Sequence, residues 1–402
     1  MRILFTAQAS YSHLAPLVLP AAESARQAGH EVAVATGNAV AEHIEKRGLT
    51  ALRLPNVEAM TDVLQRGDVR PPAAMRQFGS VTIELDPEFF ATAFVGQLAG
   101  PSARDLVEAA RDWRPDLILH ESTEFGGYLA GERLGIPHGA LDIAPMAPYD
   151  HPAVTEALNK QRADLGLGPV TDPWHVFRAF RAGVVPEEFY PEASRLPSAH
   201  YYRLPAPMGE PPLDPEIARL PAGRPLVLAT LGSNATHFPG GGVLPLLDTI
   251  IETLGDLPVT GVVALGSGTD PREWQGARAD NVHLTSFVQQ ELLLQSSDAF
   301  LTHAGFNGTR EALAAGVPVV AVPLFAEQSY NAARLQEIGV GRRIDVQDVT
   351  RESLTAAVRA VLEDRTHRSR AQSLQRRSHA LPGLSRLAAD AAAATGAAAA
   401  AG

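Results

Sequence analysis

The sequence AFLTHAGFNGTRE, residues 299–311, decides the fold of this chain. Residues 299–302 form an apolar run that predicts a buried strand, a glycine-containing turn follows, and a helix is expected to begin near Asn307. This order places free backbone N–H groups and the positive end of a helix at the carboxyl edge of a parallel sheet, where a diphosphate fits. His303, Asn307 and Thr309 would add side-chain donors. On these residues alone a structural interpretation stays open, in which Asn307 caps the helix and His303 packs under the turn.

Strand and helix patterns alternate on both sides of this stretch. In the second half, helices separate strands predicted at 226–230, 259–265, 282–284, 299–302 and 317–322. In the first half, the pattern predicts strands at 2–7, 31–36, 116–120 and 138–141, and helices at 13–29, 39–47, 86–113 and 125–134, the first of them kinked at Pro20. The alternation predicts an α/β fold with two Rossmann-like parallel-sheet domains facing each other across a cleft.

Proline density gives the expected domain boundary. Seven prolines fall between residues 205 and 225, a stretch without a core pattern. We therefore predict an N-terminal domain over 1–205, a Pro-rich linker over 206–225, and a C-terminal domain over 226–385. Residues 386–402 hold the end of a helix and an Ala-rich tail, and this C-terminal helix could pack back on the N-terminal domain.

The composition excludes several classes of protein. The 402 residues are 45% hydrophobic and 20% charged, an ordinary globular balance, and the formal net charge of −11 argues against nucleic acid or an anionic membrane as partner. No cysteine is present, which excludes disulfides, thiolate nucleophiles and cysteine-ligated metals. The N-terminal apolar run is too short for a signal peptide and no segment reaches the length of a membrane helix, so we expect a cytoplasmic protein.

The residues around the turn extend the pattern. Residues 314–332 read AAGVPVVAVPLFAEQSYNA, residues 287–290 read FVQQ, and residues 231–233 read LGS. With 299–311, they closely resemble the nucleotide-sugar signature of the family 1 glycosyltransferases, which have the GT-B fold. The chain resembles in particular the bacterial enzymes that decorate antibiotics such as macrolides and polyketides. The resemblance covers nearly the whole chain in coarse pattern and residues 287–332 in specific motifs.

The resemblance implies that the C-terminal domain binds a UDP- or dTDP-linked sugar as co-substrate, with no further cofactor. The diphosphate would be bound by Ser233, His303, Gly305, Asn307, Gly308 and Thr309. The nucleobase would lie against Phe287 and Val288, the ribose would meet Gln290 and Glu311, and the transferred sugar would bind Glu327 and Gln328.

Three residues depart from the family pattern. Gln289 replaces the usual Pro of the base-binding loop, Phe287 replaces the Trp of many relatives, and Glu327 stands where Asp is commoner. These departures bear on which donor is used and leave the reaction class unchanged.

The segment TAQASYSHLAP, residues 6–16, supplies a candidate general base. His13 is expected at the carboxyl edge of the N-terminal sheet, and histidine titrates near neutrality, as a general base should. The segment resembles the G-H-x-x-P stretch in which the family's catalytic His lies, with Ser12 in place of Gly. Glu121 matches the carboxylate that the family often places after the fourth strand. Asp116 and Glu124 are alternatives to it, and His120 is an alternative base.

Several features of the reaction follow. The sequence contains no D-x-D and no clustered His/Asp set, so we expect a metal-independent mechanism in which the helix end and His303 stabilise the leaving group. Direct in-line attack on an α-linked donor would invert the anomeric configuration, as the family does. The acceptor would be a small hydrophobic natural-product aglycone with a hydroxyl, bound in the N-terminal domain by residues such as Phe78, Phe90, Phe125 and Met146.

Two other functions stay open, a nucleotide-sugar 2-epimerase and a non-catalytic nucleotide-binding partner of another transferase. A dinucleotide-dependent oxidoreductase is disfavoured because no G-x-G-x-x-G follows the first strand. The sequence leaves open the nucleobase, the sugar, the acceptor atom (oxygen, nitrogen or carbon) and the oligomeric state, a homodimer included.

Overall fold

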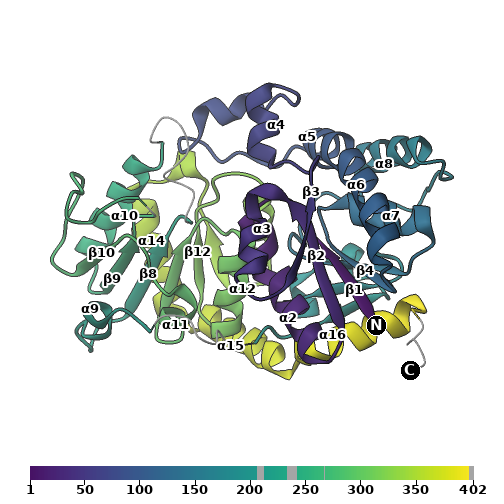
Figure 1. The fold of residues 1–402 in the computed structure, drawn as a ribbon. Helices are drawn as coiled ribbons and strands as arrows, with labels where there is room; N and C mark the ends of the chain where they lie inside the picture. Colours follow the sequence, from purple (N-terminus) through teal and green to yellow (C-terminus); the bar gives the residue numbers. More distant parts are fainter. Residues whose placement is uncertain (206–211, 233–241, 267, 398–402) are drawn as a thin grey trace. The chain divides into compact units, whose positions relative to one another are not determined.

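The computed structural model describes residues 1–205, 212–232, 242–266 and 268–397, and these form two compact units. Each unit is built on one parallel sheet, of seven and of six strands (Figure 1), which confirms the predicted α/β class. Unit 1 holds residues 1–72, 86–205 and the described residues from 381 onward. Unit 2 holds residues 73–85 and the described residues between 206 and 380.

The sheet of unit 1 has the strand order β3-β2-β1-β4-β5-β6-β7. Its strands are β1 (Arg2–Thr6), β2 (Glu31–Gly37), β3 (Thr50–Leu54), β4 (Leu117–Glu121), β5 (His138–Leu141), β6 (Arg181–Gly183) and β7 (Ala199–Tyr201). All five residues of β4 are buried, as expected for a central parallel strand covered on both faces. Because β1 pairs in parallel with β4, Thr6 lies beside His120, and the segments that follow both strands leave the sheet at the same edge.

Helices connect these strands. They are α1 (Tyr11–His13), α2 (Leu19–Gln27), α3 (Asn38–Glu45), α4 (Met60–Arg66), α5 (Pro87–Phe90), α6 (Ala99–Trp113), α7 (Phe125–Leu134) and α8 (Pro152–Asp164). The helix predicted over 13–29 is interrupted by a π-helical segment at Leu14–Val18, and α2 begins after it. Pro20 thereby becomes the second residue of α2, directly after the π-helical segment. A second π-helical segment, Ala91–Leu98, joins α5 to α6.

Unit 2 has the strand order β10-β9-β8-β11-β12-β13. The strands are β8 (Leu226–Thr230), β9 (Thr260–Ala264), β10 (Val282–Thr285), β11 (Ala299–Thr302), β12 (Val319–Ala321) and β13 (Gly341–Arg343). Its helices are α9 (Pro215–Ala218), α10 (Leu244–Asp256), α11 (Gln290–Leu294), α12 (Phe306–Ala315), α13 (Gln328–Glu337), α14 (Arg351–Glu363) and α15 (Arg365–Ala380). The short helix α9 lies inside the stretch expected to be a Pro-rich linker.

Two segments pack in a unit whose other residues are distant from them in sequence. Residues 73–85 join unit 2, where Phe78 and Ile83 enter the hydrophobic core and the Ile83 N–H donates to the Leu324 carbonyl at 2.9 Å. At the other end, helix α16 (Leu387–Thr395) packs against α2 and β5 of unit 1 (Figure 1). The Tyr202 hydroxyl donates to Asp390 Oδ2 at 3.0 Å there. The structure therefore divides the chain differently from the continuous ranges expected from proline density.

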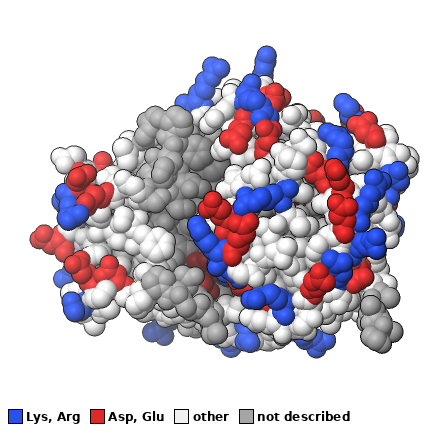
Figure 2. Space-filling view, viewed as in Figure 1, with Lys and Arg blue, Asp and Glu red and all other residues white. Residues whose placement is uncertain are grey.

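No helix among the described residues is both long and apolar enough to span a membrane. Acidic and basic side chains lie interspersed on the face shown in Figure 2. Several form surface ion pairs, such as Arg53 with Glu45 at 2.8 Å and Arg47 with Glu23 at 3.3 Å.

Candidate functional site

The strand–turn–helix of unit 2 has the expected order. Strand β11 ends at Thr302, the turn covers residues 303–305, and α12 begins at Phe306 with Gly305 as its N-cap residue. Ala304 has φ 59°, a left-handed conformation that costs an L-residue about 1–2 kcal/mol. Its carbonyl accepts from Asn331 Nδ2 at 3.0 Å and from Thr309 Oγ1 at 3.4 Å. These two buried side chains hold the strained turn in place, so Thr309 has a structural partner within the protein.

His303 is enclosed by two glycines. A Cβ on Gly232 would lie 2.9 Å from His303 Nε2, and one on Gly305 would lie 2.6 Å from the same atom. Burial lowers the pKa of His303 to about 4, although a hydrogen bond with the Thr230 backbone opposes the shift. The ring is therefore neutral at pH 7 and offers a phosphate an N–H donor without a positive charge. The electrostatic attraction for an anion then comes mainly from the N-terminus of α12.

A carboxylate lies one turn further along α12. Glu311 accepts from Gln290 Nε2 at 2.6 Å and from the Arg310 guanidinium at 3.1 Å, and burial raises the pKa of its carboxyl group. The structure thus brings together Gln290 and Glu311, the two residues predicted to contact the ribose. Phe287, three residues before Gln290, is 63% exposed, while Val288 is buried. The exposed ring of Phe287 offers a stacking face.

The sugar-binding candidates lie at the start of α13. Gln328 is buried and its Oε1 accepts from the backbone N–H groups of Leu324 and Phe325 at 2.9 and 3.1 Å. Glu327 is the half-buried N-cap residue, and Ala326 before it has φ 56°. The two left-handed alanines, 304 and 326, thus each precede predicted donor residues, a placement typical of functional sites. Ser233 lies outside the described residues.

The candidate catalytic pair of unit 1 is in contact. His13 Nδ1 lies 3.1 Å from Glu121 Oε1, and the Glu121 side chain is fully buried while that of His13 is 24% exposed. Thr123 donates its N–H to Glu121 Oε2 at 2.8 Å, and its hydroxyl lies 2.8 Å from Oε1 and 3.2 Å from His13 Nδ1. The three groups form one hydrogen-bonded cluster at the carboxyl edge of the sheet.

The alternatives to this pair have other partners. Glu124 is the N-cap of α7 and accepts from Ser102 Oγ at 2.7 Å, from two backbone N–H groups at 2.8 Å each, and from Thr6. Asp116 accepts from the Arg2 N–H at 2.7 Å, at the opposite end of β4. His120 is fully buried, and burial together with His138 lowers its pKa to about 3, which makes it far too weak a base.

The acceptor-binding candidates are placed in three different settings. Phe78 belongs to the core of unit 2, with its ring centroid 5.5 Å from that of Phe325. The prediction that Phe78 lies in the N-terminal domain is therefore wrong. It lies there because residues 73–85 pair with loops of unit 2. Phe90 and Phe125 are each 1% exposed and their ring centroids lie 6.2 Å apart, so they form core rather than a lining surface. Met146, on the loop after β5, is half-buried.

Three functional candidates were absent from the sequence-based site: Thr123, Gln8 and Asn331. Asn331 stands at the end of the nucleotide-sugar signature, and its place there was a signal that it contacts the turn. Thr123 and Gln8 carry no motif, and only the pairing of β1 with β4 brings them together. Among the described residues, no group of three or more His, Asp or Glu side chains is arranged to hold a metal ion.

One parallel-sheet unit has a His–Glu pair at its sheet edge, and the other has a strand–turn–helix of the kind that can bind a phosphate. These features are those of a glycosyltransferase of the GT-B type. The model of the UDP-glucoronosyl and UDP-glucosyl transferase family matches residues 227–383. The model of the N-terminal domain of erythromycin biosynthesis protein CIII-like proteins matches residues 23–165.

Individual relatives extend over nearly the whole chain. It is 30% identical to tylactone mycaminosyltransferase of Streptomyces fradiae, over 93% of this chain and 88% of that protein. It is 28% identical to 3-alpha-mycarosylerythronolide B desosaminyl transferase of Saccharopolyspora erythraea, over 93% and 94%. The solved glycosyltransferase SnogD from Streptomyces nogalater superposes with a TM-score of 0.73 at 25% identity, covering 98% of this chain and 99% of that one. The chain belongs to the UDP-glucoronosyl and UDP-glucosyl transferase family and is a glycosyltransferase.

Proposed function

We propose that this protein transfers a sugar from a UDP- or dTDP-sugar to a hydroxyl of a hydrophobic natural-product aglycone, with inversion and without a metal ion. His13 would be the general base and Glu121 its partner. The observation that carries the proposal is the 3.1 Å contact between His13 Nδ1 and the buried Glu121 Oε1. A carboxylate there orients the ring and stabilises the imidazolium that forms when His13 takes a proton.

The reaction balances with these groups. The acceptor hydroxyl gives its proton to His13 Nε2, and its oxygen forms a bond to the anomeric carbon. The bond from that carbon to the diphosphate breaks on the opposite face, and its electron pair leaves with the nucleoside diphosphate. The N-terminus of α12 and the neutral His303 would stabilise the departing charge, which is the support for a metal-independent mechanism.

The remaining donor contacts are proposed on the geometry of unit 2. Phe287 and Val288 would bind the base, Gln290 and Glu311 the ribose, and Gly305, Asn307 and Gly308 the diphosphate. Because Gln328 Oε1 already accepts two backbone hydrogen bonds, we propose that its amide Nε2 serves the sugar, together with the Glu327 carboxylate.

The acceptor class is proposed from the relatives. The names of the two relatives give tylactone and 3-alpha-mycarosylerythronolide B as the molecules glycosylated. We propose an acceptor of comparable size and hydrophobicity, and a reaction in the cytoplasm, where nucleotide sugars are made.

A donor–acceptor screen tests this proposal. Pooled phenolic and macrolide alcohols are incubated with UDP- and dTDP-sugars in the presence of EDTA, and products are read by mass spectrometry. A hexose or deoxyhexose mass increase on an acceptor is expected. Conversion of the nucleotide sugar to its epimer without any acceptor would instead indicate a 2-epimerase, and transfer that stops with EDTA would contradict the metal-independent mechanism.

A further inference from the structure

Glu121 is a longer partner for a catalytic histidine than an aspartate would be, and its carboxylate needs a restraint. The extra methylene adds a torsion, so an unrestrained carboxylate samples positions that do not meet the ring. Thr123 supplies the restraint: its backbone N–H donates to Oε2 at 2.8 Å and its hydroxyl lies within 2.8 and 3.0 Å of the two oxygens. Both residues are buried, which strengthens these hydrogen bonds.

From this cluster, we propose that Thr123 is a positioning residue for the reaction: its hydroxyl, committed to Glu121, fixes the tautomer of His13. The inference rests on the proposed function of His13 as base. Thr123 does not touch the reacting atoms, and it acts through Glu121 and the imidazole.

The tautomer follows from counting hydrogens. His13 Nδ1 lies 3.1 Å from a carboxylate oxygen and 3.2 Å from the Thr123 hydroxyl oxygen. A threonine hydroxyl has one hydrogen, and when this hydrogen points at the carboxylate, both oxygens near Nδ1 are acceptors. Nδ1 must then carry its proton and donate it, because a bare Nδ1 would face lone pairs on both sides. The Nε2 lone pair is thereby the one available to take a proton.

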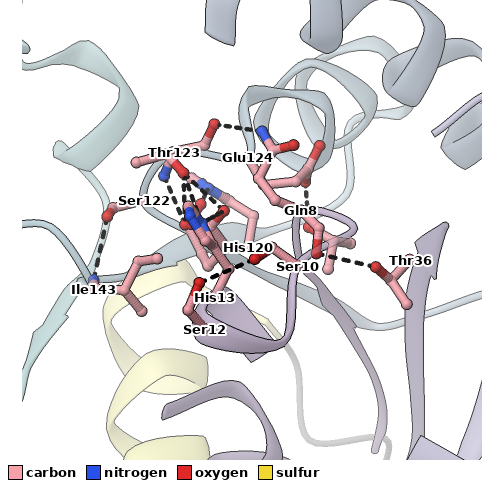
Figure 3. A network of polar contacts seen from close by, with 12 residues as sticks. Gln8, Ser10, Ser12, His13, Thr36, His120, Ser122, Thr123, Glu124 and Ile143 are labelled. Carbon is pink, nitrogen blue, oxygen red and sulfur yellow. Dashed lines mark hydrogen bonds and ion pairs between the residues drawn. The ribbon is translucent and has the colours of Figure 1, made fainter. Parts of the chain in front are cut away.

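Thr123 is held in position by Gln8, which lies after β1 on the same segment as His13. Gln8 Nε2 donates to the Thr123 carbonyl at 2.9 Å, and Thr36 Oγ1 donates to the Gln8 carbonyl at 3.2 Å (Figure 3). Gln8 follows the end of β1 by two residues and precedes His13 by five. The chain of hydrogen bonds therefore ties the loop of the proposed base to the turn of its carboxylate partner, and all three linking residues are buried.

The matched variants are Thr123→Val, which keeps the shape and the backbone N–H but removes the hydroxyl, and Thr123→Ser, which keeps the hydroxyl. The protein is labelled with ¹⁵N at histidine, and the His13 signals are assigned by their absence in His13→Ala. In wild type and Thr123→Ser we expect ¹⁵N shifts of a protonated Nδ1. In Thr123→Val, where the Glu121 carboxylate loses the hydroxyl that restrains it and can move away from Nδ1, we expect a mixture of tautomers. This measurement needs no substrate.

Turnover is measured on the same proteins with the donor and acceptor found in the screen described above. Thr123→Val should lower kcat about tenfold or more and leave KM for the nucleotide sugar within about twofold, and Thr123→Ser should stay near wild type. If Thr123→Val does not fold, Gln8→Met serves in its place, and a smaller loss with the same tautomer mixture is expected.

The outcomes separate the two proposals. Unchanged His13 tautomer and unchanged kcat in Thr123→Val, with His13→Ala inactive, would overturn the positioning role and leave the base in place. A tautomer mixture in Thr123→Val with a fully active His13→Ala would uphold the geometric role of Thr123 and overturn the assignment of the base. A loss in Thr123→Val that adds in full to the loss in His13→Ala would also overturn the proposal, since residues that act through one another are not additive.

Discussion

At the scale of single residues, the chemistry of this protein depends on how burial sets the charge of each titratable group. Glu121 is buried yet meets His13 and the Thr123 donors, so its charge has compensation. His303 is half-buried, and desolvation lowers its pKa to about 4. In the proposed mechanism, His13 accepts a proton and His303 remains a neutral donor.

The partner role of Glu121 predicts the effect of removing its charge. Glu121→Gln keeps the side-chain length but loses the charge that stabilises the imidazolium, so kcat should fall about 100-fold or more. Glu124→Gln, at the buried N-cap of α7, is the comparison. It should lower the midpoint of unfolding and have little effect on kcat. Equal kcat in Glu121→Gln and wild type would rule out the pair as the catalytic unit.

The buried His120 predicts a dependence of stability on pH. Its pKa is about 3 in the folded protein and about 6.5 in an unfolded chain. As the pH falls below about 6.5 the unfolded chain binds a proton that the folded chain refuses, so stability falls towards pH 3 and rises with pH across this window. His120→Phe should flatten the slope by about one proton. Identical slopes in wild type and His120→Phe would contradict this prediction.

The sequence predicted the His13–Glu121 pair because both positions carry a family motif. It did not show Thr123 or Gln8, which match no motif and meet only when β1 and β4 pair. The aromatic acceptor residues were predicted least well. Composition cannot distinguish a core ring such as Phe125 from a ring that lines a pocket, since both sit in apolar stretches.

At the scale of elements, the turn between β11 and α12 combines a strained residue with two close glycines. Ala304 is held at φ 59° by Asn331 and Thr309, and Gly305 leaves room for His303. The order of strand, turn and helix was predictable from spacing. The strain at Ala304 was not predictable, because alanine rarely adopts a left-handed conformation and nothing in the sequence indicates one here.

Gly305→Ala tests this packing. Its Cβ would lie 2.6 Å from His303 Nε2, so the ring must move and the donor site should lose its N–H. We expect the affinity for UDP or dTDP, measured by calorimetry, to fall about tenfold or more, as for the loss of a hydrogen bond to a charged group. Gly168→Ala, where the Cβ would meet nothing within 4 Å, is the control. Unchanged affinity in Gly305→Ala would remove His303 from the diphosphate site.

At the scale of the whole molecule, each unit contains a segment that is distant in sequence from the rest of that unit. Residues 73–85 complete the core of unit 2, and α16 packs on unit 1. Proline density predicted one boundary near 205, and continuous domains followed from it. The exchange was not predictable, because residues 56–80 have weak periodicity and contacts across hundreds of residues leave no local pattern.

Leu387, 1% exposed at the start of α16, tests the contribution of the C-terminal segment. Leu387→Ala should cost unit 1 about 2–5 kcal/mol by leaving a cavity. With Trp274→Phe removing the tryptophan of unit 2, Trp113 and Trp174 report on unit 1 alone, and the midpoint of their denaturant transition should fall. The exposed Ser385→Ala should have no effect. An unchanged midpoint in Leu387→Ala would show that unit 1 is stable without this packing.

The central claim is that His13 takes the acceptor proton while unit 2 binds the donor, and single-turnover transfer by wild type and His13→Ala with EDTA present tests it most directly. The account predicts that His13→Ala slows sugar transfer about 100-fold or more. Calorimetry on the same samples should show unchanged affinity for UDP or dTDP, because the proposed nucleotide contacts all lie in unit 2. Transfer at the wild-type rate in His13→Ala would contradict the account, and the proton would then have to pass to another group.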